Sequence, residues 1–548
     1  MHWRTGEAEW RRPCAHLHPS CGTQLRRSGC VNGSMGRNLL SLILLGAVLG
    51  IAALAAGPAR AAEVIEVDGD RAARVEDPLA PPRAQAELGV PPAGRIRAAS
   101  SRGGPLAVYR VLRRQLRTGH ISPASYRAYV NTFRRARAMR QRLAGARGSQ
   151  LGYVIGTLER IALDGRLIPS RLPELFLILR RNTQYWPSGP YPAARDWVRF
   201  RGSELMFQYF PGRGLQLHPL GTFKRANLMH ANCVHAPGTQ APRCDVIRGH
   251  SGPRGRCHRR RLRRLLDEMS RLAVHRGRGF VAWEYMFDFG GGSPPWMSAM
   301  AQAEALKAYA RAARLLDRPE YLQTARRALG AYDARWPTGV RTRGPLGGTY
   351  YLQYSFAPRL YIFNAFLDAV MGLHDFAKLT GDERARRLFR QAEPEARREV
   401  PYSDVGDWSL YNWRGDESDR SYHELLREVL QGLGIRLGGI YCTYAIRYRH
   451  YQIDPPRLRL LGPSTAVDDR LTRFRFSLSK LSVVELMVYM GRRQAYHRFA
   501  TFHRGGGSFR WRPRSPGRYT VRLRAKELRT GRGLKGSTSR SVEVEPAP

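Results

Sequence analysis

The sequence has 548 residues, of which 91 are Lys or Arg and 44 are Asp or Glu, so its formal net charge is +47 at pH 7. Its 43% hydrophobic and 10% aromatic content is typical of globular proteins and excludes a disordered chain. The charge would attract nucleic acid, anionic lipid or acidic polysaccharide. No RNP, zinc-finger or helix-turn-helix signature accompanies it, so we expect no nucleic-acid partner. Because nearly all the cations are Arg spread along the chain, a compositional bias explains the charge equally well.

The first segment with a clear pattern is residues 36–62. It holds a positive Arg37, an apolar run and the small-residue sequence Ala59-Arg60-Ala61. This order is typical of a secretory signal peptide, and an uncleaved N-terminal anchor is the alternative. Met35 directly precedes the segment, so we expect residues 1–62 to be a mis-assigned start followed by the signal peptide. The protein is accordingly predicted to be secreted or at the cell surface.

Export would permit disulfides among the remaining cysteines. Cys233 and Cys244 close a short polar loop and are the predicted pair. The alternative is a structural zinc site that these cysteines form with nearby histidines, but no CxxC or HExxH spacing is present. The histidines in question are His230, His235, His250 and His258. We therefore expect neither a metal nor a cofactor.

The N-terminal half divides by composition. Residues 63–105 are rich in Pro, Ala and Arg and are predicted to be a linker. Residues 106–185 have a helical pattern, with Ser122-Pro123 as the start of one helix. Residues 186–296 are predicted to be β-rich with a Cys- and Arg-rich insertion. Within them, two alternating runs around a Pro-Gly-Arg-Gly turn at 204–220 predict a β-hairpin.

Helical patterns dominate residues 297–452. The helices expected at 297–316 and 359–379 are each followed by a short turn and a second helix. By analogy with repeat folds, this favours an αα-barrel, or toroid-like, domain. Residues 453–548 contain short strands between turns, which predicts an Ig-like antiparallel β-sandwich. The expected fold class is multidomain α+β: a helical αα-barrel with a β-hairpin and β-rich portion, followed by that sandwich.

One short sequence in the helical region resembles a known protein family. Residues 295–312, PWMSAMAQAEALKAYARA, resemble the D-glucuronyl C5-epimerase family in their Ser-Ala-Met-Ala-Gln core. Two further segments, residues 347–376 and 404–423, are similar to that family in the same order, and residues 215–227 are similar more weakly. The last strong segment supplies the matching positions Asp404, Gly406, Tyr411, Arg414, Tyr422 and His423. The resemblance covers roughly residues 185–440.

The resemblance implies an exported, commonly dimeric enzyme that inverts C5 of D-glucuronate in an acidic, heparosan-like polysaccharide. It also implies an αα-barrel domain and a site rich in tyrosines. By motif position the catalytic candidates are Tyr354, Tyr411 and Tyr422. Where the family carries an acidic residue before its tyrosine, this chain has Gln353, which is kept as a substrate-binding candidate. The identity of the base is therefore open.

The chemistry of C5 epimerisation sets what else the site needs. A proton leaves the carbon next to the uronate carboxylate and another returns on the opposite face, so two groups must face C5. Tyrosine could fill either role if nearby positive charge lowers its pKa. The substrate carboxylate disfavours further negative charge unless donors neutralise it. Arg414 and Arg420 are predicted to bind it because guanidinium pairs bidentately, and Tyr285 and Asn364 are further substrate-binding candidates.

Two more candidates come from local patterns. Ser421-x-x-Glu424 predicts a capping box with Ser421 at the N-cap of a helix. Tyr422 and His423 would then lie in the first turn, where the partial positive charge suits an anionic substrate, so His423 is a catalytic candidate. Glu284, before a Gly/Pro loop, could replace the missing carboxylate, the alternative being a residue at a strand edge.

Two other functions fit the same residues. A polysaccharide lyase would form the same C5 carbanion and then expel the 4-O-glycosidic group. A non-catalytic acidic-glycan-binding protein would use the positive charge and the sandwich alone. The sequence leaves both alternatives open.

Overall fold

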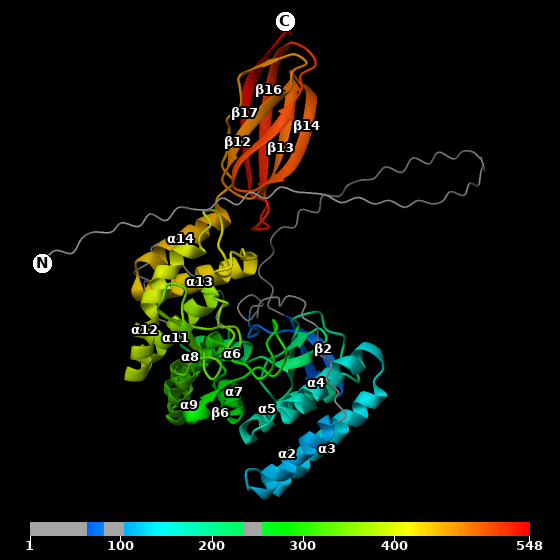
Figure 1. The fold of residues 1–548 in the computed structure, drawn as a ribbon, viewed down its shortest axis with the longest axis vertical. Helices are drawn as coiled ribbons and strands as arrows, with labels where there is room; N and C mark the ends of the chain where they lie inside the picture. Colours follow the sequence, from blue (N-terminus) through cyan, green and yellow to red (C-terminus); the bar gives the residue numbers. More distant parts are fainter. Residues whose placement is uncertain (1–62, 82–102, 235–254) are drawn as a thin grey trace, which may run out of the picture. The chain divides into compact units, whose positions relative to one another are not determined.

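The structure is a computed structural model that describes residues 63–81, 103–234 and 255–548 (Figure 1). The predicted signal peptide at 36–62 and the cysteine at 244 lie outside these ranges. Among the helices in the described ranges, none has the length and apolar character needed to cross a membrane.

The first described element belongs to a five-stranded sheet with the order β2-β1-β3-β4-β5. Its strands are β1 (Glu63–Asp68), β2 (Arg71–Glu76), β3 (Trp197–Phe200), β4 (Phe207–Phe210) and β5 (Gly214–Leu217). Strand β1 runs parallel to β3, and the other neighbours are antiparallel. The predicted hairpin at 204–220 is confirmed as β4 and β5.

The prediction of a linker is wrong for residues 63–76, which form β1 and β2. Val64, Ile65 and Val67 of β1 are at most 3% exposed. A Pro- and Ala-rich average over residues 63–105 conceals this short apolar run, and burial of its side chains against the sheet decides the structure.

Four helices follow the sheet's first hairpin in the chain and pack against one another. They are α2 (Gly104–Arg117), α3 (Pro123–Arg142), α4 (Gly145–Leu163) and α5 (Leu172–Tyr185), with a short 3-10 turn at Pro169–Arg171. The predicted start of α3 is confirmed, because the Ser122 side chain accepts a hydrogen bond from the Ser125 amide and Pro123 is the first helical residue.

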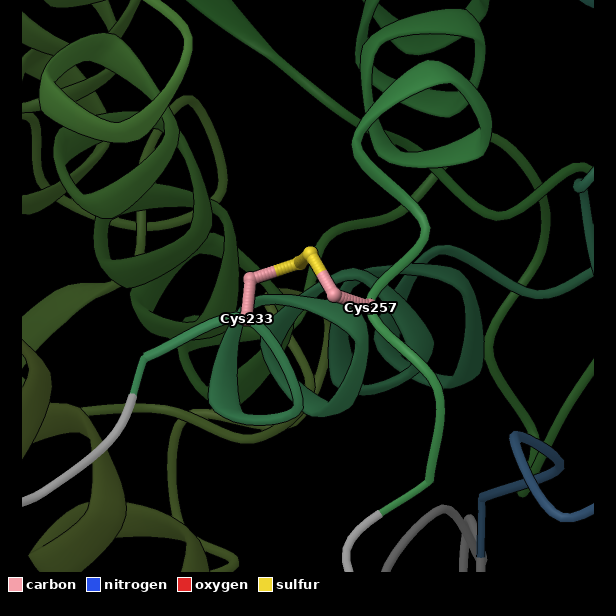
Figure 2. The surroundings of a disulfide bond; sticks show 2 residues. All are labelled: Cys233 and Cys257. Carbon is pink, nitrogen blue, oxygen red and sulfur yellow. A yellow bond between two sulfur atoms is a disulfide. The ribbon is translucent and has the colours of Figure 1, made fainter.

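A disulfide joins the end of α6 (Pro219–Ala231) to the start of α7 (Arg259–Arg271) (Figure 2). It links Cys233 to Cys257, with the two Cα atoms 4.5 Å apart. The predicted Cys233–Cys244 pair is therefore wrong. Sequence proximity favoured Cys244, whereas the packing of α6 against α7 brings Cys257 to Cys233. Across the described ranges, no three His, Cys, Asp or Glu side chains are grouped so that they could hold a metal ion.

Removing this disulfide is expected to destabilise the protein by about 3 kcal/mol, because the cross-link restricts the unfolded chain over a separation of 24 residues. The comparison is urea unfolding of Cys233→Ser/Cys257→Ser against the oxidised wild type. Peptide mapping without reductant checks the pairing itself: a peptide linking Cys233 to Cys244 would contradict the structure.

The helical region that follows contains two helix-turn-helix units, as the sequence predicted. One is α8 (Ala299–Leu315) with α9 (Glu320–Ala328), and the other is α11 (Phe363–Thr380) with α12 (Glu383–Glu399). The remaining helices are α10 (Gly330–Asp333), α13 (Arg420–Leu437) and α14 (Ile440–Ile453), with 3-10 turns at Gly277–Gly279 and Val400–Ser403. Helix α8 packs against both α6 and α11. Its many alanines allow a close approach, since a Cβ on Gly372 of α11 would lie 2.6 Å from that of Ala303.

Two small hairpins lie between these helices in the chain. They are β6 (Val274–Arg276) with β7 (Phe280–Ala282) and β8 (Arg341–Arg343) with β9 (Thr349–Tyr351). The second hairpin leads directly into Gln353 and Tyr354.

The C-terminal region consists of two sheets with a shared apolar core that includes Phe474, Leu486 and Val521. One sheet has the order β10-β12-β15 and the other β11-β17-β16-β13-β14. The strands are β10 (Leu458–Leu460), β11 (Thr465–Val467), β12 (Thr472–Leu478), β13 (Ser482–Met490), β14 (Arg493–Phe502), β15 (Gly505–Trp511), β16 (Gly517–Glu527) and β17 (Lys535–Glu545). The prediction of a multidomain chain of helices and sheets with a β-rich C-terminus is confirmed.

Candidate active site

Three predicted tyrosines come together from three separate segments. Tyr354 follows β9, Tyr411 lies in the loop between α12 and α13, and Tyr422 is the third residue of α13. The rings of Tyr411 and Tyr422 have centroids 4.6 Å apart. A side-chain hydrogen bond joins Tyr411 to Tyr354. We call these three residues the tyrosine cluster.

Tyr354 is held in place by the chain before α8. The Ala299 amide donates to the Leu352 carbonyl at 2.9 Å, and the Ser355 amide donates to the Met297 carbonyl at 2.9 Å. The Tyr354 ring lies 5.6 Å from Trp296, and Phe289 and Phe356 also contact it. Backbone pairing and aromatic packing together fix the direction of this side chain.

The loop that carries Tyr411 is tied to the start of α11. The Tyr411 amide donates to the Asp416 carbonyl at 2.7 Å, and its own carbonyl accepts from the Phe363 amide at 3.2 Å. The Asn412 side-chain amide donates to the Asp416 carboxylate at 2.8 Å. The polar, aromatic segment around Tyr411 is therefore an ordered loop, and its hydrogen bonds hold the Tyr411 backbone in place.

Electrostatics make Tyr411 a group that keeps its proton. Burial raises the pKa of the Tyr411 hydroxyl well above its usual value, and the neighbouring Tyr354 and Tyr422 raise it further. This is the opposite of the lowered pKa that a tyrosine base would need. The arrangement favours Tyr411 as a proton or hydrogen-bond donor.

Helix α13 begins two residues before the predicted position. Asp419 is its N-cap and accepts a hydrogen bond from the Tyr422 amide at 2.8 Å. The capping box of Ser421 and Glu424 is therefore wrong. Asp caps a helix as well as Ser does, and the Glu424 side chain stays 48% exposed instead of reaching back.

His423 is buried as a packing residue. Its ring stacks on Trp408 with centroids 3.6 Å apart. Its Nδ1 lies 2.8 Å from the Ser409 hydroxyl and its Nε2 lies 3.2 Å from the Tyr448 carbonyl oxygen. Burial lowers the pKa of His423 to about 3. Both ring nitrogens are engaged and the ring is neutral, so its geometry does not fit the predicted catalytic role.

A pH dependence follows from this burial. His423 stays neutral in the folded protein down to a pKa of about 3, whereas in the unfolded chain it gains a proton near pH 6.5. The unfolded state then binds the extra proton, so the free energy of unfolding should fall as the pH drops below about 6.5. Urea unfolding at pH 7 and pH 5 measures this slope.

The His423→Gln variant should show a shallower slope than the wild type, because its side chain does not titrate. His497→Gln, at an exposed ring on β14, is the matched control and should keep the wild-type slope. Equal slopes for His423→Gln and the wild type would contradict the assignment.

The neighbouring residues Glu284 and Tyr285 have different surroundings. Glu284 is fully buried and pairs with Arg171 at 2.7 Å and with Arg276 at 3.0 Å. Its charge is already neutralised, which argues against its use as the missing base. Tyr285 stacks on Trp296 with ring centroids 4.2 Å apart, and Trp296 in turn contacts Tyr354 of the tyrosine cluster at 5.6 Å.

The remaining candidates differ in burial. Gln353 is buried, and its side-chain oxygen accepts from the Ser298 hydroxyl at 2.9 Å, which links it to the N-cap of α8. Asn364 is buried at the start of α11. Arg414 and Arg420 have exposed side chains.

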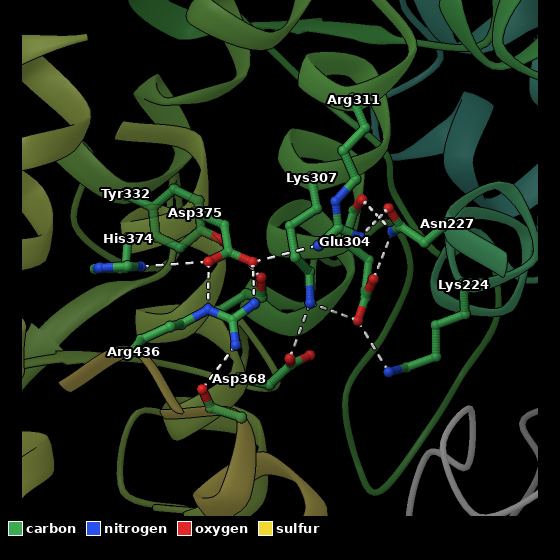
Figure 3. A network of polar contacts seen from close by, with 12 residues as sticks. Lys224, Asn227, Glu304, Lys307, Arg311, Tyr332, Asp368, His374, Asp375 and Arg436 are labelled. Atoms are coloured by element: carbon green, nitrogen blue, oxygen red, sulfur yellow. Dashed lines mark hydrogen bonds and ion pairs between the residues drawn. The ribbon is translucent and has the colours of Figure 1, made fainter. Parts of the chain in front are cut away.

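A buried ionic network lies between helices α6, α8 and α11, and sequence reasoning missed it (Figure 3). Glu304 is 2.9 Å from both Lys224 and Lys307, and Lys307 is 3.1 Å from Asp368. Burial raises the pKa of Asp368 despite the nearby Lys307. The signal in the sequence was a Glu and a Lys three positions apart inside an Ala-rich helix.

A second missed residue is His218, the N-cap of α6. Its Nδ1 accepts from the Gly221 amide at 3.0 Å, while its buried Nε2 has no hydrogen-bond partner within the described residues. Burial lowers the pKa of His218 to about 3. Its ring lies 5.4 Å from that of Tyr285. The sequence signal was a His before Pro at a helix start, in the segment with the weaker resemblance.

Part of the chain matches a known protein family. Residues 277–448 match the profile described as D-glucuronyl C5-epimerase C-terminus. The match contains Gln353 and the whole tyrosine cluster. Residues 277–448 are therefore similar to the C-terminal part of the D-glucuronyl C5-epimerase family, and we call them the C5-epimerase domain. The matched range includes neither helices α2–α5 nor the C-terminal sheets.

Two curated relatives are similar to parts of the chain. A D-glucuronyl C5-epimerase of Caenorhabditis elegans is 26% identical over 133 residues, which is 22% of each chain. An uncharacterized protein of Methanocaldococcus jannaschii is 28% identical over 177 residues, covering 31% of this chain and 58% of that protein. The chain thus spans less than two thirds of either relative.

Similarity to solved structures is low. A CARDB domain of Pyrococcus furiosus is 13% identical with a TM-score of 0.14, covering 18% of this chain and 98% of that one. The endo-β-1,4-glucanase CMCax of Acetobacter xylinum is 15% identical with a TM-score of 0.24, covering 39% of this chain and 72% of that one. At these scores the similarities carry no argument about the C5-epimerase domain.

Proposed function

We propose that the protein is an exported uronate C5-epimerase that inverts C5 of D-glucuronate in an acidic, heparosan-like polysaccharide. The observation that carries the proposal is the tyrosine cluster, whose three residues all lie within 277–448, the range that matches the family profile. The reaction needs groups that move protons at one carbon, and the cluster offers three hydroxyls.

In the proposed reaction the C5–H bond breaks and its proton passes to a base, while the electron pair moves into the adjacent carboxylate group. A second group then gives a proton to C5 on the opposite face and forms the new C–H bond. No atom is gained or lost overall. We assign Tyr411 as the donor, because its raised pKa keeps it protonated. The base in this proposal is either Tyr354 or Tyr422.

Incubation with heparosan and other glucuronate polymers in deuterated water tests this function. A C5-epimerase incorporates deuterium at C5, which proton NMR or mass spectrometry detects, and converts part of the glucuronate to iduronate. A lyase would instead produce a 4,5-unsaturated uronate with ultraviolet absorbance. Absence of deuterium at C5 across the whole panel would overturn both enzymatic functions.

A non-catalytic acidic-glycan-binding protein is the second candidate, and Gln353 favours it. The family resemblance implies a carboxylate at this position, whereas the Gln353 side chain is uncharged and already bonded to Ser298. The diagnostic result would be tight binding of the polymer with no proton exchange at C5.

The domain organisation and location are part of the same proposal. We propose that residues 297–452 form an αα-barrel, that residues 453–548 form an Ig-like sandwich, and that the protein is a homodimer. The Cys233–Cys257 disulfide supports export, because disulfides persist in oxidising compartments. Sedimentation velocity tests the dimer, and N-terminal sequencing of the secreted protein tests cleavage near residue 61.

A further inference from the structure

Two hollows in the surface, outside the tyrosine cluster, share an exposed tryptophan. Trp336 is 44% exposed. One hollow has a volume of about 670 Å³ and the other about 770 Å³, and Trp336, Arg335 and Arg341 line both of them. We call the two hollows and the tryptophan that they share the Trp336 groove.

The backbone around Trp336 is fixed by hydrogen bonds. The Trp336 amide donates to the Arg341 carbonyl at 3.0 Å, the Arg341 amide donates to the Ala334 carbonyl at 3.2 Å, and the Gly339 amide donates to the Arg335 carbonyl at 2.8 Å. The Trp336 ring therefore projects from a turn whose backbone is already ordered. Using it in binding costs no conformational entropy for ordering that backbone.

The groove is positively charged and its arginines are available. Arg335, Arg341 and Arg343 line the larger hollow, where no acidic side chain occurs. Within the described residues, none of the three forms an ion pair. The smaller hollow contains one acid, Asp333, which already pairs with Arg384 and with Arg387 at 3.3 Å.

The rest of the lining is suited to hydroxyl groups. Thr342, Thr349 and Gln391 line the larger hollow and Thr338 lines the smaller one. Hydroxyl and amide side chains both donate and accept hydrogen bonds. A flat ring, uncompensated guanidinium groups and such side chains together match a sugar ring that carries carboxylates. Single-stranded nucleic acid fits less well, because it is bound by successive aromatic side chains and this groove exposes one.

Strand β9 connects the Trp336 groove to the candidate active site. Thr349, at the start of β9, lines the groove, and Tyr354 follows five residues later. Five residues span at most about 18 Å. One polymer chain could therefore contact both places.

We infer that the Trp336 groove is an accessory binding site for acidic polysaccharide, which holds a polymer chain near the tyrosine cluster. The proposal rests on the proposed function only in taking the bound polymer to be a substrate as well. Its central test measures binding and needs no turnover, so its failure is distinct from failure of the epimerase proposal.

The test is isothermal titration calorimetry, in which heparosan is titrated into the wild-type protein and into three variants. Trp336→Ala and the double variant Arg335→Ser/Arg343→Ser should each weaken binding about tenfold, the size of effect expected for a central contact residue. Trp336→Tyr retains an aromatic ring and should bind nearly as well as the wild type. Thermal unfolding of every variant verifies that it is folded.

Matched controls separate the groove from general charge. Arg134→Ser/Arg135→Ser removes the same charge from an exposed face of α3, and Phe499→Ala removes an exposed ring from β14. Both should bind heparosan as the wild type does. Unchanged binding by Trp336→Ala and by the groove double variant would overturn the inference. The inference would also be overturned if the protein bound single-stranded DNA more tightly than heparosan and the same substitutions weakened that binding.

Where exchange at C5 is observed, a kinetic result should accompany the binding result. Trp336→Ala should raise KM for the long polymer about tenfold while leaving kcat and the rate with a short oligosaccharide unchanged, because the groove does not touch the reacting carbon. A fall in kcat on both substrates would instead place Trp336 in the active site and contradict an accessory role.

Discussion

Replacing Tyr411 with Phe is expected to lower the rate of deuterium incorporation at C5 of glucuronate by about 10²–10⁴-fold, the usual contribution of a positioned proton-transfer group. The substitution removes one hydroxyl and its hydrogen bond with Tyr354, and leaves the ring that packs on Tyr422. The measurement is the initial rate of exchange at a saturating polymer concentration. The proton donor proposed for the reaction is then absent while the surrounding packing remains.

Tyr126→Phe provides the control, because Tyr126 is a partly buried tyrosine on α3 outside the C5-epimerase domain. It should retain wild-type exchange. Both variants should unfold at nearly the wild-type temperature. Full exchange activity in Tyr411→Phe would show that this hydroxyl does not take part in the proton transfer.

The second large effect is on stability and concerns Glu304. Glu304→Gln is expected to lower the free energy of unfolding by about 3–5 kcal/mol, because it leaves Lys224 and Lys307 buried without their shared carboxylate. Urea unfolding at pH 7 measures the change. Glu383→Gln, which removes an exposed carboxylate paired with Arg386, should cost less than about 1 kcal/mol.

The effect of Glu304 should also depend on pH. Burial alone would raise the pKa of Glu304, but Lys224 and Lys307 outweigh burial and hold the pKa well below its usual range. A carboxylate with a lowered pKa stabilises the fold at pH values above the pKa in the unfolded chain, about 4.3, and loses this effect as the pH falls further. The difference between wild type and Glu304→Gln should therefore shrink below about pH 4. A difference that is constant from pH 7 to pH 3 would contradict the ionic role.

Much of the fold could be predicted from local patterns. Ser122-Pro123 marked a helix start, and the Pro-Gly-Arg-Gly turn marked a hairpin, because both depend on backbone chemistry within a few residues. The strand β1 was missed since its few apolar residues lie beside a Pro-rich stretch. Its structure depends on pairing with β3, more than 100 residues away in the sequence.

The candidate site was predicted in part. Tyr354, Tyr411 and Tyr422 were found by resemblance, and the structure brings them together. His423 and Glu284 were assigned by proximity to motif residues, but proximity in sequence does not show which way a side chain points. The His423 ring stacks on Trp408, and the Glu284 carboxylate pairs with Arg171. The ionic network around Glu304 was missed because its partners lie on three helices that only tertiary packing brings together.

The Cys233–Cys257 disulfide has a practical consequence for engineering the protein. The chain leaves α6 and returns to α7 at two Cα atoms 4.5 Å apart, so the segment between them begins and ends at a single point of the fold. Loop length affects stability only weakly once the ends are held together. Adding or removing residues between Cys233 and Cys257 should therefore change the free energy of unfolding only slightly, so the number of residues between the two cysteines can be varied when the protein is engineered.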